Sequence, residues 1–148
     1  MAVPSKRILL VEENGVCTHF LTQLLSCLGY AVTEATTGLE GIYKAAIEIP
    51  DLIMMGADLP QLTGIEVTDW LKHRPYTKDI PVLIYAPSPT LGGKDDACKA
   101  GASAVINDPI TVDALRKAFQ LCFLSRKETL RDLGDDSKIV QPPIGRYL

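Results

Sequence analysis

Four carboxylates stand at matching places in the chain, each shortly after an apolar run. Glu12 and Glu13 directly follow the run at residues 7–11, Asp58 follows the run at residues 51–55, and Asp108 follows a third. Carboxylate oxygens are the ligands that hard cations such as Mg²⁺ and Ca²⁺ prefer. If the fold brings these groups together, the sequence predicts an acidic pocket that could hold a divalent cation. This pocket would contain no visible basic side chain.

Short apolar runs alternate with amphipathic stretches along most of the chain, which predicts strands alternating with helices. Caps and helix stops mark the boundaries: Asn14 and Thr111 are placed to cap helices, and residues 37–40 and 63–66 read as capping boxes. Glycines at 92 and 93 predict a weak start for the helix near residues 90–100. The predicted strands are residues 7–11, 31–35, 51–55, 81–85 and 104–106.

Strands and helices alternating in this way require right-handed crossovers and a parallel sheet covered on both faces. We therefore predict an α/β, flavodoxin-like fold, a doubly wound five-stranded parallel sheet of order 2-1-3-4-5 flanked by five helices. The second strand is half polar, which favours an edge position. Ligands of such folds bind at the carboxyl ends of the strands. That rule singles out Glu12, Glu13, residues 56–58, Ala86 and residues 107–108.

Helical periodicity also predicts which side chains face the core. Each helix carries apolar residues at intervals of three and four, so one stripe of each helix should be buried. The predicted inward residues are Val16, Phe20, Leu21, Leu24, Leu25 and Leu28; Ile42, Ala45, Ala46 and Ile49; Val67, Trp70 and Leu71; and Val112, Leu115, Ala118, Phe119, Cys122 and Phe123.

Composition narrows the class of protein. A chain of 148 residues with a net charge of −3 fits one domain and gives no electrostatic reason to expect nucleic acid or an anionic membrane as a partner. No apolar run approaches the roughly 20 residues that span a bilayer, and the first residues lack a secretory signal, so a cytoplasmic location is expected. The four cysteines form no CxxC pair and are expected to be mostly buried thiols in a reducing compartment.

The character of the chain changes after its last predicted helix. Residues 1–126 are expected to form the α/β domain. Leu130 and Leu133 could prolong the last helix, and the following residues contain Pro142 and Pro143. Residues 127–148 are therefore expected to be a helix extension followed by a flexible tail.

Four stretches, in this order and spacing, resemble the receiver domains of two-component response regulators across residues 5–126. They are RILLVEEN, PDLIMMGADLPQLTGIEV, PVLIYAP and AGASAVINDP. In a working receiver, an aspartate after the third strand attacks a phosphoryl group, and the acidic pair holds a divalent cation. A Ser or Thr hydroxyl and a lysine then bind the phosphoryl product.

The resemblance implies that the chain lacks the side chains that accept and bind the phosphoryl group in the family. The phosphoacceptor position is Gly56, which cannot be a nucleophile, and the hydroxyl position is Ala86. The lysine position is Asp108, a reversal of charge, and the aromatic position of the fifth strand is Val105. Two unit charges about 4 Å apart interact by roughly 4 kcal/mol at an effective dielectric constant of about 20. A carboxylate at 108 would therefore repel a phosphoryl group.

The resemblance thus predicts a degenerate receiver that is not an enzyme and takes no cofactor. A residual Mg²⁺ or Ca²⁺ site formed by Glu12, Glu13 and Asp58, the last through its backbone carbonyl, remains an open alternative. A second alternative is that these acidic side chains are solvated, or that mutual repulsion raises the pKa values of some of them.

Two functions follow. The preferred one is a non-phosphorylatable pseudo-receiver that binds signalling proteins in a two-component pathway. Its partners would be a histidine kinase, another response regulator or a second copy of itself. The family's docking face would comprise parts of residues 91–99, 104–106 and 111–126. Candidate interaction residues are Asp96, Val105, Asp108 and Thr111. The alternative is a sensor that binds a divalent cation or small ligand in the acidic pocket.

Overall fold

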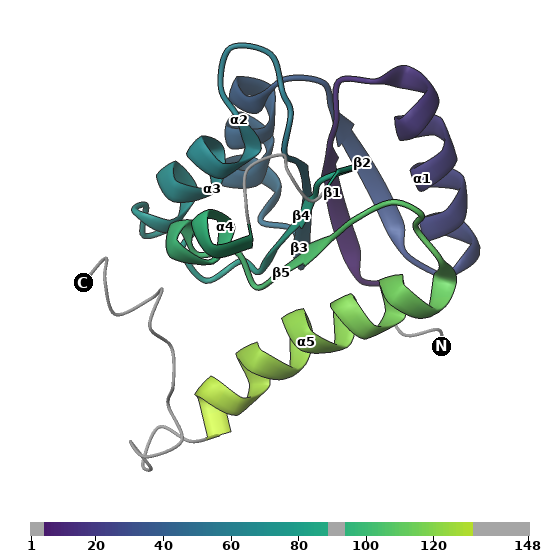
Figure 1. Cartoon of the computed structure of the whole chain (residues 1–148). Helices are drawn as coiled ribbons and strands as arrows, with labels where there is room; N and C mark the ends of the chain where they lie inside the picture. The colour runs from purple at the N-terminus through teal and green to yellow at the C-terminus, as the bar shows by residue number, and fades with distance from the viewer. Residues whose placement is uncertain (1–4, 89–93, 132–148) are drawn as a thin grey trace.

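The computed structural model describes residues 5–88 and 94–131, and Figure 1 shows the arrangement of the elements. Five parallel strands form one sheet of order β2-β1-β3-β4-β5, which confirms the predicted fold and the edge position of the second strand. The strands are β1 (Arg7–Val11), β2 (Ala31–Ala35), β3 (Leu52–Gly56), β4 (Val82–Tyr85) and β5 (Ala104–Ile106).

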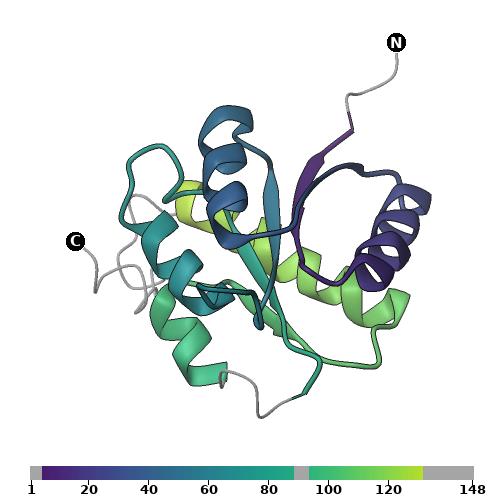
Figure 2. The same cartoon turned by 90° about the horizontal axis from the view of Figure 1, so that it is seen from above.

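Helices cover both faces of this sheet (Figure 2). The core side chains of α1 and α5 pack in one cluster, and those of α2, α3 and α4 belong to a second cluster on the opposite face. The helices are α1 (Gly15–Cys27), α2 (Gly38–Glu48), α3 (Gly64–Lys72), α4 (Lys94–Ala100) and α5 (Val112–Arg131).

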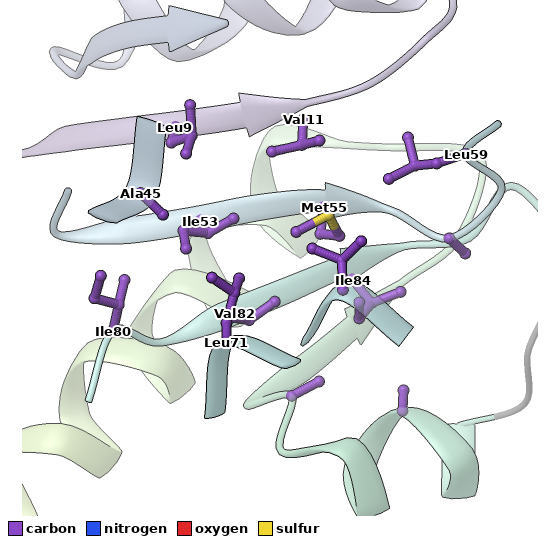
Figure 3. Close-up of a cluster of buried hydrophobic side chains, with 14 of the residues drawn as sticks. Leu9, Val11, Ala45, Ile53, Met55, Leu59, Leu71, Ile80, Val82 and Ile84 are labelled. Atoms are coloured by element: carbon purple, nitrogen blue, oxygen red, sulfur yellow. The ribbon is translucent and has the colours of Figure 1, made fainter. Parts of the chain in front are cut away.

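Alternation along β1 shows how one strand serves both clusters. Ile8 and Leu10 pack against the side that carries α1 and α5, whereas Leu9 and Val11 pack against the other side. Figure 3 shows the second cluster, with Leu9 and Val11 near the buried side chains of β3 and β4. All five residues of β3 are buried, as expected for the central strand of a doubly wound sheet.

Helix caps fix where the helices that follow the site begin. The Asn14 side chain accepts a hydrogen bond from the Cys17 backbone N–H at 3.0 Å, and Thr111 accepts one from Ala114 at 3.0 Å. Thr63 and Glu66 form the complete capping box that was predicted. At α2 the box is incomplete, because Glu40 accepts from the backbone of Thr36 at 2.7 Å.

The predicted helix faces were partly wrong. In α1, Thr18, Leu21 and Leu25 are buried, while Val16 is 82% and Phe20 53% exposed, because the helix contacts the sheet through a narrower stripe than predicted. In α3, Trp70 is 41% exposed, and the Arg74 guanidinium lies 3.9 Å from the centre of its ring.

The inward face of α2 was also misjudged, because glycines carry no apolar signal. Gly38, Gly41 and Ala45 are the buried residues of α2, whereas Ala46 and Ile49 are exposed. A Cβ on Gly41 would lie only 2.8 Å from a methyl carbon of Val11, so the helix approaches β1 as closely as a glycine permits. In α5, Val112 is exposed, while Leu115, Ala118, Phe119 and Cys122 are buried as predicted.

Three further predictions concern the C-terminal part of the chain, the cysteines and membrane-spanning segments. The last helix runs to Arg131, and the end of the predicted extension and the predicted tail lie outside the described residues, as do Gly92 and Gly93. Cys122 is buried, Cys17 and Cys98 are half-buried, and Cys27 is exposed, so the expectation of mostly buried thiols holds only in part. Within residues 5–88 and 94–131, no helix is long and apolar enough to cross a bilayer.

Candidate functional site

The carboxyl ends of the strands bring the sequence-predicted positions to one edge of the sheet. Glu12 follows β1, Gly56 ends β3, Ala86 follows β4 and Asp108 lies shortly after β5. Backbone hydrogen bonds join these ends, with Ala57 N–H donating to the Tyr85 carbonyl at 2.8 Å and Ala86 N–H donating to the Ile106 carbonyl at 2.9 Å. The site is therefore built on the last pairs of the sheet itself.

The Glu12 side chain lies against the backbone of Gly56. Glu12 is only 8% exposed, although it is a carboxylate at a strand end. A Cβ built on Gly56 would overlap Glu12 Oε1 and would lie 3.3 Å from the Val11 carbonyl oxygen. The Glu12 carboxyl group thus fills the space in which any side chain at position 56 would begin.

Local hydrogen bonds hold Glu12 in this position. Its Oε2 accepts from the Asn14 backbone N–H at 2.8 Å, and its backbone carbonyl accepts from the buried Thr18 hydroxyl at 3.3 Å. Asn14 is also the cap of α1, so the turn between β1 and α1 is fixed by the same residues that fix Glu12.

Burial is the main influence on the protonation of Glu12. It raises the pKa of the carboxyl group above its ordinary value, while the hydrogen bond from Asn14 lowers it. The charges of Glu13 and Asp58 raise the pKa further. The open alternative of mutual repulsion is therefore supported at Glu12, but desolvation contributes more.

The other predicted cation ligands do not converge on this carboxyl group. Glu13 and Asp58 are exposed, and among the described residues no group of three or more His, Cys, Asp or Glu side chains could hold a metal ion. Glu12 points to Gly56 and is hydrogen-bonded to Asn14, and position 56 supplies no carboxylate. The described residues thus offer few convergent oxygen ligands, and a divalent cation here would depend on water for most of its coordination.

Asp108 is paired with the hydroxyl of Tyr85, a residue that the sequence did not identify as part of the site. The Tyr85 hydroxyl donates to the two carboxylate oxygens of Asp108, at 2.9 Å to Oδ1 and 3.1 Å to Oδ2. Tyr85 is buried, and its burial together with this hydrogen bond raises the pKa of the phenol above its ordinary value. The position of Tyr85 directly before Ala86 on the strand was the signal that could have identified it.

Cys17 connects the two acidic positions. Burial raises the pKa of its thiol, the charge of Glu12 raises it further, and a hydrogen bond with Tyr85 partly offsets both. Cys17, on α1, therefore lies close enough to Glu12, Tyr85 and Asp108 for all three to influence the pKa of its thiol. Because the thiolate is the nucleophilic form of cysteine, a raised pKa makes the Cys17 thiol less reactive.

Ala86 has no polar side chain to contribute, and its methyl group is buried in the core cluster that α2, α3 and α4 cover. Its carbonyl oxygen accepts a hydrogen bond from the Asn107 side-chain amide at 2.7 Å. Asn107 therefore stabilises the edge of the sheet between β4 and β5, and position 86 offers no hydroxyl.

The predicted interaction residues occupy different surroundings. Asp96 is exposed in the first turn of α4, and Asp108 is exposed apart from its bond with Tyr85. Val105 is half-buried against the core, and the Thr111 hydroxyl is used in capping α5. Asp96 and Asp108 therefore both present exposed carboxylates to a partner.

Comparisons with known proteins agree with this arrangement. The sequence model of a family described as the response regulator receiver domain matches residues 8–120. The chain is 32% identical over 108 residues to the polar-differentiation response regulator DivK of Brucella ovis, a match that covers 73% of this chain and 88% of that protein. The DivK of Brucella anthropi is 33% identical over 107 residues, covering 72% and 87%.

Solved structures show the same fold. The receiver domain of the sensor histidine kinase PA1611 from Pseudomonas aeruginosa, described with a magnesium ion in its active-site cleft, superposes with a TM-score of 0.74. It is 25% identical, and the match covers 80% of this chain and 98% of that one. A response regulator described as putative from Chloroflexus aurantiacus, 21% identical over 81% of this chain and 99% of that one, superposes with a TM-score of 0.76 and supports the fold alone.

Proposed function

The chain belongs to the response regulator receiver domain family, and from that membership we propose that it is a pseudo-receiver. It keeps the receiver fold and acts in a two-component pathway by binding other signalling proteins. It does not accept a phosphoryl group on an aspartate. Receiver domains are signalling modules and not catalytic domains, and this one signals without the covalent switch.

The contact between Glu12 and Gly56 carries the proposal. Phosphoryl acceptance requires a carboxylate nucleophile at the end of β3, and Gly56 has no side chain. The neighbouring Glu12 carboxyl group fills the space where such a side chain would start. Glu12 is also not aimed at an incoming phosphoryl group, because it is buried and bonded to the Asn14 backbone.

The other two positions oppose phosphoryl binding as well. Ala86 lacks the hydroxyl that would donate to a phosphoryl oxygen, and Asp108 presents a negative charge where the family has a lysine. Asp108 is held by the Tyr85 hydroxyl at 2.9 and 3.1 Å. A carboxylate fixed in this way would repel a phosphoryl group, whose oxygens carry negative charge.

A scaffold without its reactive site can still serve as a binding surface, because fold and site chemistry are separable. We propose that the surface of α4, β5 and the start of α5 binds the partner, with Asp96 and Asp108 as its exposed polar groups. The partner would be a histidine kinase, another response regulator or a second copy of this chain, in the cytoplasm. We assign this role to residues 1–126, with residues 127–148 as an extension.

The alternative, a sensor of divalent cations in the acidic pocket, has less support. Glu13 and Asp58 are exposed, and Glu12 is already bonded within the protein. A cation would have to draw Glu12 away from Gly56 and break its bond with Asn14.

A binding assay with and without phosphodonor tests the proposed function. The full chain is immobilised, and the cytoplasmic part of a histidine kinase from the same organism is titrated over it, with and without acetyl phosphate and Mg²⁺. We expect the same affinity in both conditions. Asp96→Lys should weaken the binding, whereas Asp79→Lys, an exposed acid before β4, should not. An affinity that changes with phosphodonor would contradict the proposal.

A further inference from the structure

A groove lies at the opposite edge of the sheet from the candidate site. It has a volume of about 760 Å³ and is lined by Lys6, Leu28, Tyr30, Arg116, Phe119, Gln120 and Phe123. Lys6 directly precedes β1 and Tyr30 directly precedes β2, so the groove is at the amino ends of these strands. Its volume falls within the range of small-molecule sites in proteins, which is roughly 300–1,000 Å³.

Aromatic side chains form the walls of the groove. The rings of Tyr30 and Phe119 meet edge to face with their centres 5.2 Å apart, and those of Phe119 and Phe123 lie 6.3 Å apart. Phe119 is buried, whereas Tyr30 and Phe123 are half-buried. The walls of the groove thus present apolar ring surface to a ligand, and buried Phe119 anchors them to the core.

The charged groups of the groove are all positive. Lys6 Nζ lies 5.0 Å from the centre of the Phe123 ring, and the charge of Arg116 lowers the pKa of the Tyr30 phenol against the larger opposite effect of burial. Among the side chains that the structure describes, those of residues 5–88 and 94–123, no Asp or Glu lines the groove and neither Lys6 nor Arg116 forms an ion pair. Two cations beside apolar rings are complementary to a ligand that joins an anionic group to a flat apolar body.

We propose that this groove is a binding site for a small aromatic anion, with its ring against Tyr30 and Phe123 and its anionic group near Lys6 and Arg116. The site is separate from the acidic edge of the sheet, where Glu12 and Asp108 would repel such a ligand. It is also separate from the proposed loss of phosphorylation, because none of its residues belongs to that site.

The test uses the full chain and 8-anilinonaphthalene-1-sulfonate, an aromatic sulfonate whose fluorescence rises when it binds. We expect saturable binding, with shifts in a ¹H–¹⁵N spectrum confined to the amides around Leu28, Tyr30 and residues 116–123. Lys6→Gln and Arg116→Gln should each weaken binding by about tenfold, the loss expected for one charge-assisted hydrogen bond. The uncharged analogue N-phenyl-1-naphthylamine should bind more weakly to the natural chain.

Lys117→Gln is the matched control. Lys117 is on the same helix but is exposed and paired with Asp113 at 3.2 Å, so its loss should leave the affinity unchanged. Equal affinity in Arg116→Gln, Lys6→Gln and the natural chain would overturn the proposal, because it would show that the dye binds apolar surface alone. Absence of saturable binding, or spectral shifts centred on other residues, would overturn it too.

Discussion

Glu12 Oε1 lies so close to Gly56 that a Cβ on residue 56 would clash with it, so the carboxyl group after β1 and a side chain at the end of β3 compete for the same space. Two changes in the sequence are thereby physically linked. A residue with a side chain at 56 requires that Glu12 turn away, and the buried position of Glu12 requires that residue 56 have none. The absence of a side chain at position 56 and the inward position of the Glu12 carboxyl group form a single structural feature.

Substitution of Gly56 by alanine measures this link. Among the described glycines only Gly29 and Gly101 have positive φ, so the backbone at 56 suits alanine, and any cost comes from the contact with Glu12. We expect Gly56→Ala to lower the free energy of unfolding by about 1 kcal/mol, since Glu12 must leave its hydrogen bond with Asn14. Urea unfolding gives the value.

A double-mutant cycle supplies the control for that substitution. Glu12→Asp shortens the acid by one methylene and leaves room for a Cβ on residue 56. In this background Gly56→Ala should cost less, with a coupling free energy of about 0.5–1 kcal/mol. Additive effects of the two substitutions would mean that the side chains do not share this space.

Glu12→Gln should stabilise the protein in a pH-dependent way. Because burial raises the pKa of Glu12 above its ordinary value of 4.5, folding disfavours the charged form. The destabilisation is absent in acid, grows as pH rises from the ordinary value through the raised one, and is complete above it. The amide can still accept from Asn14. The melting temperature of Glu12→Gln should therefore exceed that of the natural chain by roughly 2–4 °C at neutral pH and match it in acid.

Asp79→Asn provides the comparison for this pH series, because Asp79 is exposed and is not among the groups that shift the pKa of Glu12. Its melting temperature should follow the natural chain at every pH. A Glu12→Gln advantage that persists undiminished in acid would contradict the buried, charged state of Glu12 at neutral pH.

Asp108→Asn should lower the pKa of Tyr85. The hydrogen bond and charge of Asp108 contribute to the raised pKa of this phenol, whereas burial contributes independently and remains in the variant. The pKa should therefore fall without reaching its ordinary value. An alkaline titration of the ¹³C-labelled tyrosine ring measures the change, with Asp113→Asn as the control. An unchanged Tyr85 pKa in Asp108→Asn would mean that the pairing does not form in solution.

Restoring the acceptor alone should not restore phosphorylation. Gly56→Asp places a carboxylate beside Glu12, while Ala86 and Asp108 stay unsuited to a phosphoryl group. We expect no labelling of this variant by acetyl phosphate on a phosphate-affinity gel. Adding Glu12→Asp, Ala86→Thr and Asp108→Lys to it should produce labelling. If Gly56→Asp alone were labelled at the same rate as the combined variant, the roles assigned to the other positions would be wrong.

The fold was predictable because its signals are local. The continuous apolar run of β3, the half-polar β2 and the caps at Asn14, Thr63 and Thr111 each determine one element without reference to the rest of the chain. Alternation of strands and helices then leaves few topologies, and the strand order followed from it. The inward faces of the helices were less predictable, because Gly38 and Gly41 pack inward without being apolar.

The site was predictable in position but not in its contacts. The carboxyl ends of the strands identified Glu12, Gly56, Ala86 and Asp108 as neighbours. The inward position of Glu12 depends on the missing side chain at Gly56, and the pairing of Tyr85 with Asp108 depends on the face of β4 on which the Tyr85 side chain lies. Both are contacts between residues distant in sequence, so no local sequence pattern predicts them.

The most direct test of the pseudo-receiver proposal is a ¹H–¹⁵N spectrum of the natural chain titrated with beryllofluoride and Mg²⁺, which mimic a phosphorylated aspartate in receivers. The combined Glu12→Asp, Gly56→Asp, Ala86→Thr and Asp108→Lys variant is the positive control. We predict no saturable shifts at the amides of Gly56, Ala57 and Ala86 in the natural chain. Saturable shifts at these amides in the natural chain would contradict the account.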